Sequence, residues 1–391
     1  MISPVGYDFE AGMHLFRYQG LNILLDVNSG AVHVLDDISY YLVDKIRNYN
    51  GDIHAATKDL RSEYSQQELR EVLTELESLY EAKSIFSEED PLYIDLSNLS
   101  IKAMCLNVAH ACNMKCHYCF AEQGDFGMSP GLMSLETGKK ALDFLLIRSG
   151  ATKNLEVDFF GGEPLLNVDM LKELVQYGRQ QEEKWGKKFN FTLTTNALLL
   201  DDDIIEFIIN NHISVILSLD GRPETNDRHR ILSTGGGSYK VIVPKIKKMV
   251  DQKPLSYYIR GTFTRRNLDF CNDLEHIVQL GFNSVSLEPA VGPTNDYSIK
   301  EEDLAQVLTE YDRLTDLLCS YHRAGQEVHF FHYNLDLQRG PCLAKRQSGC
   351  GAGVEYLVVT PPGDIYACHQ FVGEEDFRMG NIYEIGRASC R

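Results

Sequence analysis

The first ninety residues contain short extended runs followed by helical repeats. Apolar and polar residues alternate in three runs between residues 13 and 34, and turn-forming residues separate these runs. Apolar positions then recur with a helical period in three stretches: 38–48, 53–60 and 66–83. The pattern predicts a domain over residues 1–90 with a small sheet and three helices. The acidic, proline-containing segment 87–91 predicts a linker after it.

From residue 101 onward, strand-like runs alternate with helix-like runs. Six apolar runs fit strands: 103–108, 155–160, 189–194, 213–219, 257–264 and 284–287. Five stretches near them have helical periodicity: 134–148, 168–184, 202–210, 239–251 and 269–280. Strands joined by helical crossovers form parallel sheets, so we predict an α/β core over residues 101–325, open or closed as a partial barrel. Chemistry is expected at the C-terminal ends of its strands.

The composition fits a folded protein and disfavours nucleic-acid and membrane partners. The chain has 391 residues, 43% of them hydrophobic, which is enough for two or three domains. Its formal net charge of −18 repels phosphate backbones and anionic lipid, so we expect no nucleic-acid partner and no membrane partner. The sequence has neither a signal peptide nor about 18 uninterrupted apolar residues, and we expect a cytoplasmic protein.

Three of the ten cysteines lie in one short loop after the first predicted strand of the core. Cys112, Cys116 and Cys119 have the spacing Cys-x3-Cys-x2-Cys. Three thiolates can bind three irons of a [4Fe–4S] cubane and leave the fourth iron open for a chelating cofactor. The alternative is a structural zinc site with His110 or His117 as the fourth ligand, although such sites usually have a second ligand pair nearby.

Further polar groups follow the later strands. The run Gly161-Gly162-Glu163-Pro164 ends the second strand, where the glycines allow the backbone to approach a ligand and Glu163 can accept hydrogen bonds from an ammonium group. Taken alone, this run also fits an ordinary strand-to-helix turn. The residues that follow the next two strands include three more candidates: Asn196, Ser218 and Arg230.

A second group of cysteines lies nearer the C-terminus. Cys342, Cys350 and Cys368 can bind an auxiliary cluster or a zinc ion, or can be unrelated buried thiols. Three further cysteines fall within predicted strands and helices, and we expect core thiols there: Cys105, Cys271 and Cys319.

The cysteine loop, with aromatic Tyr118 before its third cysteine, resembles the signature of radical S-adenosylmethionine (SAM) enzymes. The resemblance implies a partial (β/α)6 barrel with a [4Fe–4S] cluster on Cys112, Cys116 and Cys119, which is used to make radicals from SAM. Ser218 and Arg230 would hold the ribose and the carboxylate of SAM. The full set of residues that this resemblance places at the cofactor is Tyr118, Gly161, Gly162, Glu163, Asn196, Ser218 and Arg230.

Longer runs resemble a narrower group of enzymes. Residues 26–36, 158–164, 260–264, 340–346 and 368–372 are similar to the maturases of six-cysteines-in-forty-five (SCIFF) peptides. Those oxidoreductases install thioether cross-links between cysteine sulfurs and carbons of other residues in a ribosomally made, cysteine-rich precursor. The resemblance implies that the N-terminal domain is a winged-helix-like module that binds the precursor. It also implies an electron donor such as flavodoxin or ferredoxin.

The C-terminal cysteines resemble the opening half of a SPASM domain, which carries auxiliary [4Fe–4S] clusters in radical enzymes that modify peptides. We therefore expect residues 335–391 to be a partial, truncated SPASM segment with Cys342, Cys350 and Cys368 as cluster ligands. Residues 384–391 can be back-translated into sequencing-adapter DNA. Our hypothesis is that the natural chain continues and that its own sequence lacks Cys390.

Three alternatives stay open at this point. An anaerobic sulfatase-maturing enzyme shares the core and SPASM, but its relatives have an acidic base where this chain has His369. A peptide-modifying enzyme that forms carbon–carbon bonds or epimers is a closer alternative. From another class, a non-catalytic peptide-binding protein would keep the fold without cleaving SAM, which the intact cysteine loop argues against.

Overall fold

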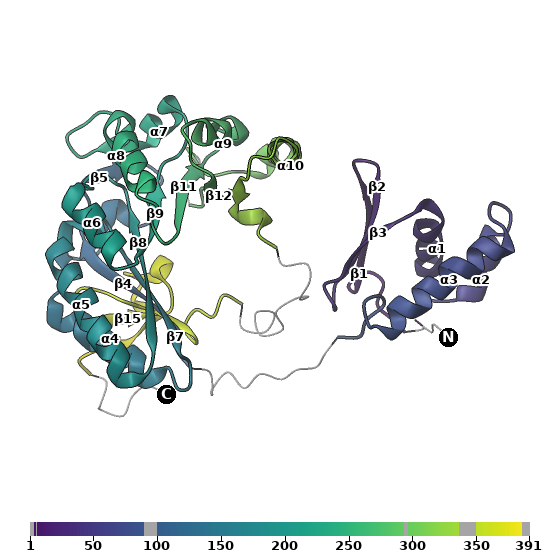
Figure 1. The fold of residues 1–391 in the computed structure, drawn as a ribbon, viewed down its shortest axis with the longest axis horizontal. Coiled ribbons are helices and arrows are strands. Elements are labelled where there is room, and N and C mark those ends of the chain that lie inside the picture. Colours follow the sequence, from purple (N-terminus) through teal and green to yellow (C-terminus); the bar gives the residue numbers. More distant parts are fainter. Residues whose placement is uncertain (1–3, 5, 90–99, 293–295, 336–348, 385–391) are drawn as a thin grey trace. The chain divides into compact units, whose positions relative to one another are not determined.

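The computed structural model describes residue 4 and residues 6–89, 100–292, 296–335 and 349–384. The described residues divide into two compact units. Unit 1 comprises those up to residue 89 together with residues 335 and 349, and unit 2 comprises those from 100 to 334 and from 350 to 384. Each unit has a hydrophobic core of its own, and each is traced by colour in Figure 1.

Unit 1 is a three-stranded antiparallel sheet followed by three helices. Strand β2 lies between β1 and β3 and pairs with both. The elements are β1 Met13–Tyr18, β2 Leu21–Asp26, β3 Val32–Leu35, α1 Asp37–Asn48, α2 Ile53–Leu60 and α3 Gln66–Glu81. This is the element order that the sequence predicted for this part of the chain.

Each helix of unit 1 begins at a side chain that caps its first turn. The carboxylate of Asp36 accepts a hydrogen bond from the backbone of α1, and that of Asp52 does the same for α2. Ser65 and Glu68 form a capping box at the start of α3. Removing one such cap costs about 1 kcal/mol. The buried face of α3 then consists of Leu69, Val72 and Leu76.

Ser87 belongs to unit 1, so the predicted linker was wrong at this residue. Ser87 is buried, its backbone N–H donates to Asp26 Oδ2 at 3.1 Å, and its hydroxyl donates to Asp26 Oδ1. Ser29 Oγ donates to the same carboxylate at 2.8 Å. Asp26, at the end of β2, therefore holds the chain that follows α3. Residues 90 and 91 of the predicted linker lie outside the described ranges.

Unit 2 contains a parallel sheet whose strand order follows the chain. Neighbouring strands from β4 to β12 are parallel and are joined by helical crossovers. Figure 1 shows α4, α5 and α6 along the outer side of the strands. The six strands are β4 Ala103–His110, β7 Asn154–Gly161, β8 Lys188–Thr195, β9 Ser214–Ser218, β11 Tyr257–Phe263 and β12 Ser284–Pro289. The predicted α/β fold with a parallel sheet is confirmed.

Helices and short strands complete unit 2. The helices are α4 Leu135–Arg148, α5 Val168–Trp185, α6 Asp202–Asn210, α7 Pro223–His229, α8 Tyr239–Asp251, α9 Phe270–Gln279 and α10 Leu304–Arg323. The short strands are β5 Met114–Cys116, β6 Gly131–Leu132, β10 Arg230–Leu232 and β13 His329–Phe330. In the described ranges, no helix is long and apolar enough to cross a bilayer.

Alternating burial along the strands separates the core face from the face that carries chemistry. In β8, the buried residues Phe189, Phe191 and Leu193 alternate with less buried ones. Strand β4 is buried along nearly its whole length, because it lies inside the sheet between β7 and β14. Polar residues at the strand ends are thus held on a rigid support.

The C-terminal residues extend the core sheet. Strand β14 Tyr356–Val359 pairs in parallel with β4, and β15 Asp364–Tyr366 and β16 Arg378–Asn381 continue the sheet antiparallel. We expected a SPASM segment over 335–391. In the structure, the described residues after 349 group with unit 2, while 336–348 and 385–391 lie outside the described ranges.

The predicted core thiols have different environments. Cys105 in β4 and Cys271 in α9 are buried, as predicted. Cys319 is exposed, and the prediction for it was wrong. Helix α10 buries only Glu310 and Leu314 fully, so most of its surface, including the face of Cys319, has no core to enter.

Candidate active site

The three cysteines of the loop after β4 line one cavity of about 270 Å³. The middle of this loop forms β5, which pairs with β10 so that Cys116 lies opposite Arg230. The Cys119 N–H donates to the Cys116 carbonyl at 3.2 Å, and the Met114 N–H donates to Cys112 Sγ at 3.4 Å. All three thiols are half-buried, so backbone contacts present them to the cavity in a fixed arrangement.

Burial makes these thiols poor anions on their own. It raises the pKa of Cys112 to about 12 and that of Cys116 to about 11. Without a positive ligand, both thiols stay protonated at neutral pH and are weak ligands and nucleophiles. A bound metal would displace the protons and compensate the buried negative charge. The site is therefore suited to a cationic group that takes thiolate ligands.

The two histidines of the zinc alternative contact other rings. Across the described ranges, no three Cys, His, Asp or Glu side chains converge on one metal-ion position. His110 is buried with its ring centroid 5.2 Å from that of Phe126, and exposed His117 lies 5.9 Å from His229. A [4Fe–4S] cubane needs no shared position, since each thiolate binds a different iron.

The two glycines after β7 allow the turn to pack against the cysteine loop. Gly161 has a φ of +125°, and a Cβ there would lie 2.3 Å from the Ala109 oxygen. A Cβ on Gly162 would lie 2.1 Å from the Ala111 oxygen. The N–H groups of Gly162 and Glu163 donate to these two carbonyls at 2.8 and 2.9 Å. Protein packing thus requires glycine here, and both glycines also line the cavity.

The Glu163 carboxylate joins this turn to the end of β8. It is buried and accepts hydrogen bonds from the Leu165 N–H at 3.0 Å, Thr195 Oγ1 at 2.7 Å and the Asn196 N–H at 2.8 Å. Burial raises the pKa of Glu163. A carboxylate has about four acceptor positions, so about one is left for the ammonium group predicted from the sequence.

Asn196 contacts the cysteine loop from the end of β8. Its Oδ1 accepts a hydrogen bond from the Leu198 N–H at 2.9 Å, which orients the amide. Its Nδ2 donates to Asn113 Oδ1 at 2.7 Å and to Cys112 Sγ at 3.7 Å. Hydrogen bonds to cluster sulfurs tune the reduction potential, so Asn196 is placed to act on a bound cluster as well as to line the cavity.

Tyr118 connects two buried charges. The Arg230 guanidinium donates to the Tyr118 hydroxyl at 3.1 Å, and that hydroxyl donates to the two Asp220 oxygens at 2.8 and 2.7 Å. The Thr262 N–H also donates to Asp220 at 3.1 Å. Burial raises the pKa of Asp220 to about 6. Arg230 Nε is buried without a hydrogen-bond partner in the described structure, which leaves a donor for a carboxylate ligand.

Sequence reasoning missed Asp220. It lies two residues after Ser218 at the end of β9, in a run that we examined for Ser218 alone. An available signal was its position, since a carboxylate beside a glycine at the C-terminal end of a parallel strand is a candidate for chemistry. Its partners Tyr118 and Thr262 come from distant parts of the chain, and no local pattern reports them.

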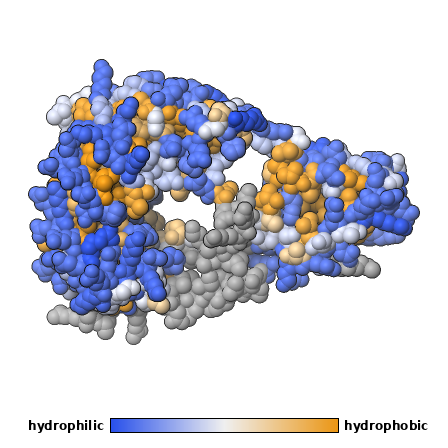
Figure 2. Space-filling model, in the orientation of Figure 1, coloured by the Kyte–Doolittle hydropathy of each residue, from blue (hydrophilic) through white to orange (hydrophobic). Residues whose placement is uncertain are grey.

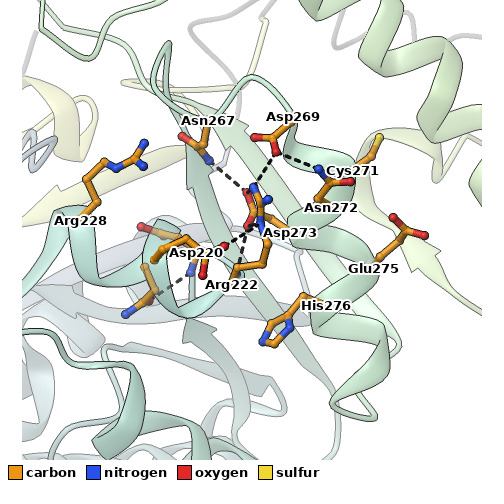
Figure 3. A network of polar contacts seen from close by, with 12 residues as sticks. Asp220, Arg222, Arg228, Asn267, Asp269, Cys271, Asn272, Asp273, Glu275 and His276 are labelled. Carbon is orange, nitrogen blue, oxygen red and sulfur yellow. Dashed lines mark hydrogen bonds and ion pairs between the residues drawn. The ribbon is translucent and has the colours of Figure 1, made fainter.

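A second network fixes the turn that carries Asp220, and Figure 3 shows it. The backbone N–H and Nε of Arg222 donate to Asp273 Oδ1 in α9 at 3.0 and 2.8 Å. Asn267 Nδ2 donates to the other Asp273 oxygen at 3.3 Å. Asp273 is fully buried, and a Cβ on Gly221 would lie 2.3 Å from its Cβ. The turn after β9 is therefore closely packed against α9.

The structure brings the first cysteine group and all the predicted cofactor residues around the same cavity. These cofactor residues are Tyr118, Gly161, Gly162, Glu163, Asn196, Ser218 and Arg230. Of the C-terminal cysteines in the described ranges, neither the exposed Cys350 nor the half-buried Cys368 lines it, and Cys342 lies outside these ranges. The residues directly after Cys368, His369 and Gln370, do line it.

Comparison with known proteins agrees with this geometry. Residues 106–261 match the radical SAM superfamily. The match extends from β4 to β11 of the parallel sheet. Members of this superfamily bind SAM and a [4Fe–4S] cluster, and the three cysteines, the free acceptor position on Glu163 and the free donor on Arg230 suit these groups.

Several relatives of this chain are named as maturation enzymes. It is 28% identical over 288 residues to the mycofactocin maturase MftC of Mycobacterium tuberculosis, covering 71% of this chain and 67% of that protein. It is 26% identical over 295 residues to a cysteine-type anaerobic sulfatase-maturating enzyme of Clostridium novyi, covering 70% and 74%. Streptococcus suis SuiB bound to the precursor peptide SuiA shares the fold, with a TM-score of 0.54 at 17% identity over 94% of this chain and 84% of that one.

Proposed function

We propose that this radical SAM enzyme installs thioether cross-links in a cysteine-rich, ribosomally synthesised precursor peptide. The observation that carries the proposal is the single cavity that gathers three cysteines and seven predicted cofactor residues. Relatives named as maturases, and the solved complex of SuiB with a precursor peptide, support a peptide as the substrate class. The resemblance to SCIFF maturases supports thioether formation within that class.

The side chains divide the work of holding the cofactors. When bound, the cluster and SAM supply a 5′-deoxyadenosyl radical that removes hydrogen from the substrate. Glu163 would accept a hydrogen bond from the SAM ammonium group at its remaining acceptor position. Arg230 would donate from Nε to the SAM carboxylate, while Tyr118 and Asp220 keep its guanidinium in place. Ser218, at the end of β9, would contact the ribose.

An auxiliary cluster on Cys342, Cys350 and Cys368 is part of this proposal. Pairing of β14 with β4 fixes the C-terminal strands on the core, and His369 and Gln370 line the cavity. A cluster held at Cys368 would therefore lie next to residues that face the substrate. Such a cluster supplies an electron acceptor, which formation of a carbon–sulfur bond from a carbon radical and a thiolate requires.

Unit 1 is proposed to recognise the precursor. In the described structure β3 pairs only with β2, so its other edge is free to add a peptide strand. The side chains of Val32 and Val34 are 40% and 65% exposed on this strand. Figure 2 shows hydrophobic residues gathered over the sheet of unit 1. Main-chain pairing along β3, with apolar contacts at these valines, would hold an extended leader.

Mass spectrometry of the product tests the proposed function. The chain is reconstituted anaerobically with iron and sulfide, and is co-expressed with the small cysteine-rich reading frame next to its gene. Each thioether removes two hydrogens and consumes one free thiol. A carbon–carbon cross-link removes two hydrogens but leaves every thiol free to alkylate, and epimerisation leaves the mass unchanged. Failure to form 5′-deoxyadenosine under reducing conditions would favour the non-catalytic alternative.

A further inference from the structure

The cavity has a second half that the predicted cofactor residues leave unused. Strands β7, β11 and β12, the end of the cysteine loop and the C-terminal segment supply its walls. Its lining includes two opposite charges at neighbouring strand ends, Arg260 and Glu288, together with the rings of Phe120, Phe160 and His369. Ring centroids within this aromatic group lie 5.2 to 6.2 Å apart. This half therefore combines an apolar surface with one fixed anion and one cation.

Glu288 is held in a fixed orientation as a hydrogen-bond acceptor. Ser286 Oγ donates to Glu288 Oε1 at 2.6 Å, and His332 Nε2 lies 3.0 Å from Oε2. Because a carboxylate only accepts, Nε2 carries the proton, and Nδ1 accepts from the Tyr311 hydroxyl at 3.1 Å. These contacts occupy about half of the acceptor positions of Glu288. Its side chain stays 30% exposed and faces the cavity with the rest.

Arg260 provides donors beside this acceptor. The register of β11 and β12 pairs Thr262 with Glu288 and Arg260 with Ser286, so Arg260 lies two residues back on the same face. Arg260 is exposed, and no hydrogen bond or ion pair holds its guanidinium among the described residues. A donor-only group and an acceptor-only group therefore stand side by side, both open to the cavity.

This pair selects a neutral group that has both a donor and an acceptor. A free carboxylate would be attracted by Arg260 but repelled by Glu288. A free ammonium group would be attracted by Glu288 but repelled by Arg260. A peptide unit offers one N–H and one C=O and satisfies both residues without net charge. Apolar side chains of a peptide fit the rings on the other wall.

We propose that Glu288 and Arg260 form the subsite that holds the main chain of the peptide substrate next to the reacting residue. Glu288 accepts a hydrogen bond from a substrate N–H, and Arg260 donates to a substrate C=O. His332 and Tyr311 are positioning residues that orient the Glu288 carboxylate. The inference rests on the proposed peptide substrate. It adds the position of the substrate main chain and the protein atoms that bind it.

The test uses capped acetyl-Gly-Cys-Gly-amide and a set of analogues in which one amide at a time is replaced by an ester. An ester lacks the N–H but keeps the shape of the backbone. Binding to the full chain, reconstituted and saturated with SAM but without reductant, is measured by ligand-observed NMR. We expect one ester to bind about tenfold more weakly, the loss typical of a hydrogen bond to a charged group. The Glu288→Ala variant should bind the parent peptide that weakly and be insensitive to the same ester.

Matched variants separate the subsite from general effects. Glu288→Gln keeps the shape and a neutral acceptor, so it should recover part of the affinity lost in Glu288→Ala. Arg260→Met should weaken every analogue alike, because it contacts a carbonyl that the esters keep. Glu327→Gln and Arg323→Met change exposed charges outside the cavity and should bind like the wild type.

Two results would overturn the subsite. In the first, every ester analogue binds the wild type with an affinity within about twofold of that of the parent peptide. Such a difference is smaller than the loss of one hydrogen bond to a charged group. The other is equal ester sensitivity in the wild type and in Glu288→Ala. The first comparison needs no variant, so a variant that misfolds does not remove the test. Formation of 5′-deoxyadenosine by the reduced wild type without peptide is measured in parallel, and its absence counts against the proposed function instead.

Discussion

Asp273 should be far more important for stability than a similar carboxylate two residues later on the same helix. Asp273 pairs with Arg222 at 2.8 Å, and its side chain is fully buried. Glu275 pairs with Arg313 at 2.9 Å, but its side chain is 36% exposed. The pairs have the same chemistry and nearly the same length, and differ in burial. Removing one partner of a buried pair costs about 3–5 kcal/mol, and the lower value applies here because Arg222 is 24% exposed and keeps Asp269 at 2.9 Å. An exposed pair contributes less than about 1 kcal/mol.

We therefore expect Asp273→Asn to lower the free energy of unfolding by about 3 kcal/mol, near the low end of that range because the amide keeps one acceptor. Glu275→Gln should lower it by less than about 1 kcal/mol. Both are measured by urea denaturation of the full chain. Because Arg222 follows the turn with Asp220, Asp273→Asn should also weaken SAM binding by about tenfold, or about 1.4 kcal/mol, measured by calorimetry under anaerobic conditions.

Equal losses of stability in the two variants would refute the argument from burial. A large loss of stability in Asp273→Asn with unchanged SAM affinity would show that the network supports the fold without positioning the cofactor residues. Arg222→Lys is a useful companion, since lysine keeps the charge but loses the paired geometry of Nε and Nη2 toward Asp273. It should fall between the wild type and Asp273→Asn.

Three more predictions concern other parts of the chain. Cys116→Ala should abolish 5′-deoxyadenosine formation, assayed by chromatography, because a cubane without one of three protein ligands is labile. Val34→Lys should weaken binding of the leader peptide to the full chain in fluorescence anisotropy, whereas Ile147→Lys, equally exposed at 65% but in unit 2, should not. Burial raises the pKa of Asp158 from 3.8 to about 6, so this group stabilises the fold at low pH, and that contribution, at most about 3 kcal/mol, is lost as pH rises through about 6. Asp158→Asn should remove this loss, which is measured as the difference in the free energy of unfolding between pH 4 and pH 7. If the variant keeps the pH dependence of the wild type, the reasoning is wrong.

The sequence predicted the elements of the core well, because the apolar pattern within each element reflects which of its faces is buried. Phe189, Phe191 and Leu193 alternate along β8 because one face of that strand is covered by helices. The same reasoning failed for Cys319. Its helix, α10, has an apolar stripe, but such a stripe does not determine how much of the helix packs against other elements. In the structure α10 buries little of its surface. The pairing of β14 with β4 was equally invisible, since Tyr356 and its partner Ala103 are 253 positions apart.

The candidate site was predictable where one short segment carries its own chemistry. The spacing of Cys112, Cys116 and Cys119 is such a case. The partners that orient the site are not local: Tyr118 and Asp220 are 102 positions apart, and their hydrogen bonds follow from strand order. The two oxygens of Glu163 were expected to face a ligand, but most of their capacity goes to donors in their own turn and at the end of β8. Such sharing depends on the folded arrangement.

Because β5 pairs with β10, the number of residues in the cysteine loop also sets the register of this strand pair. Cys116 lies opposite Arg230, and Met114 lies opposite Leu232. Side chains alternate between the two faces of a strand, so one extra residue before Cys116 would turn either its thiol or the opposite guanidinium to the wrong face. An insertion could thus disable the arginine without altering it. Lineages of this enzyme would then retain the loop length under two separate selective pressures, one from iron and one from strand pairing.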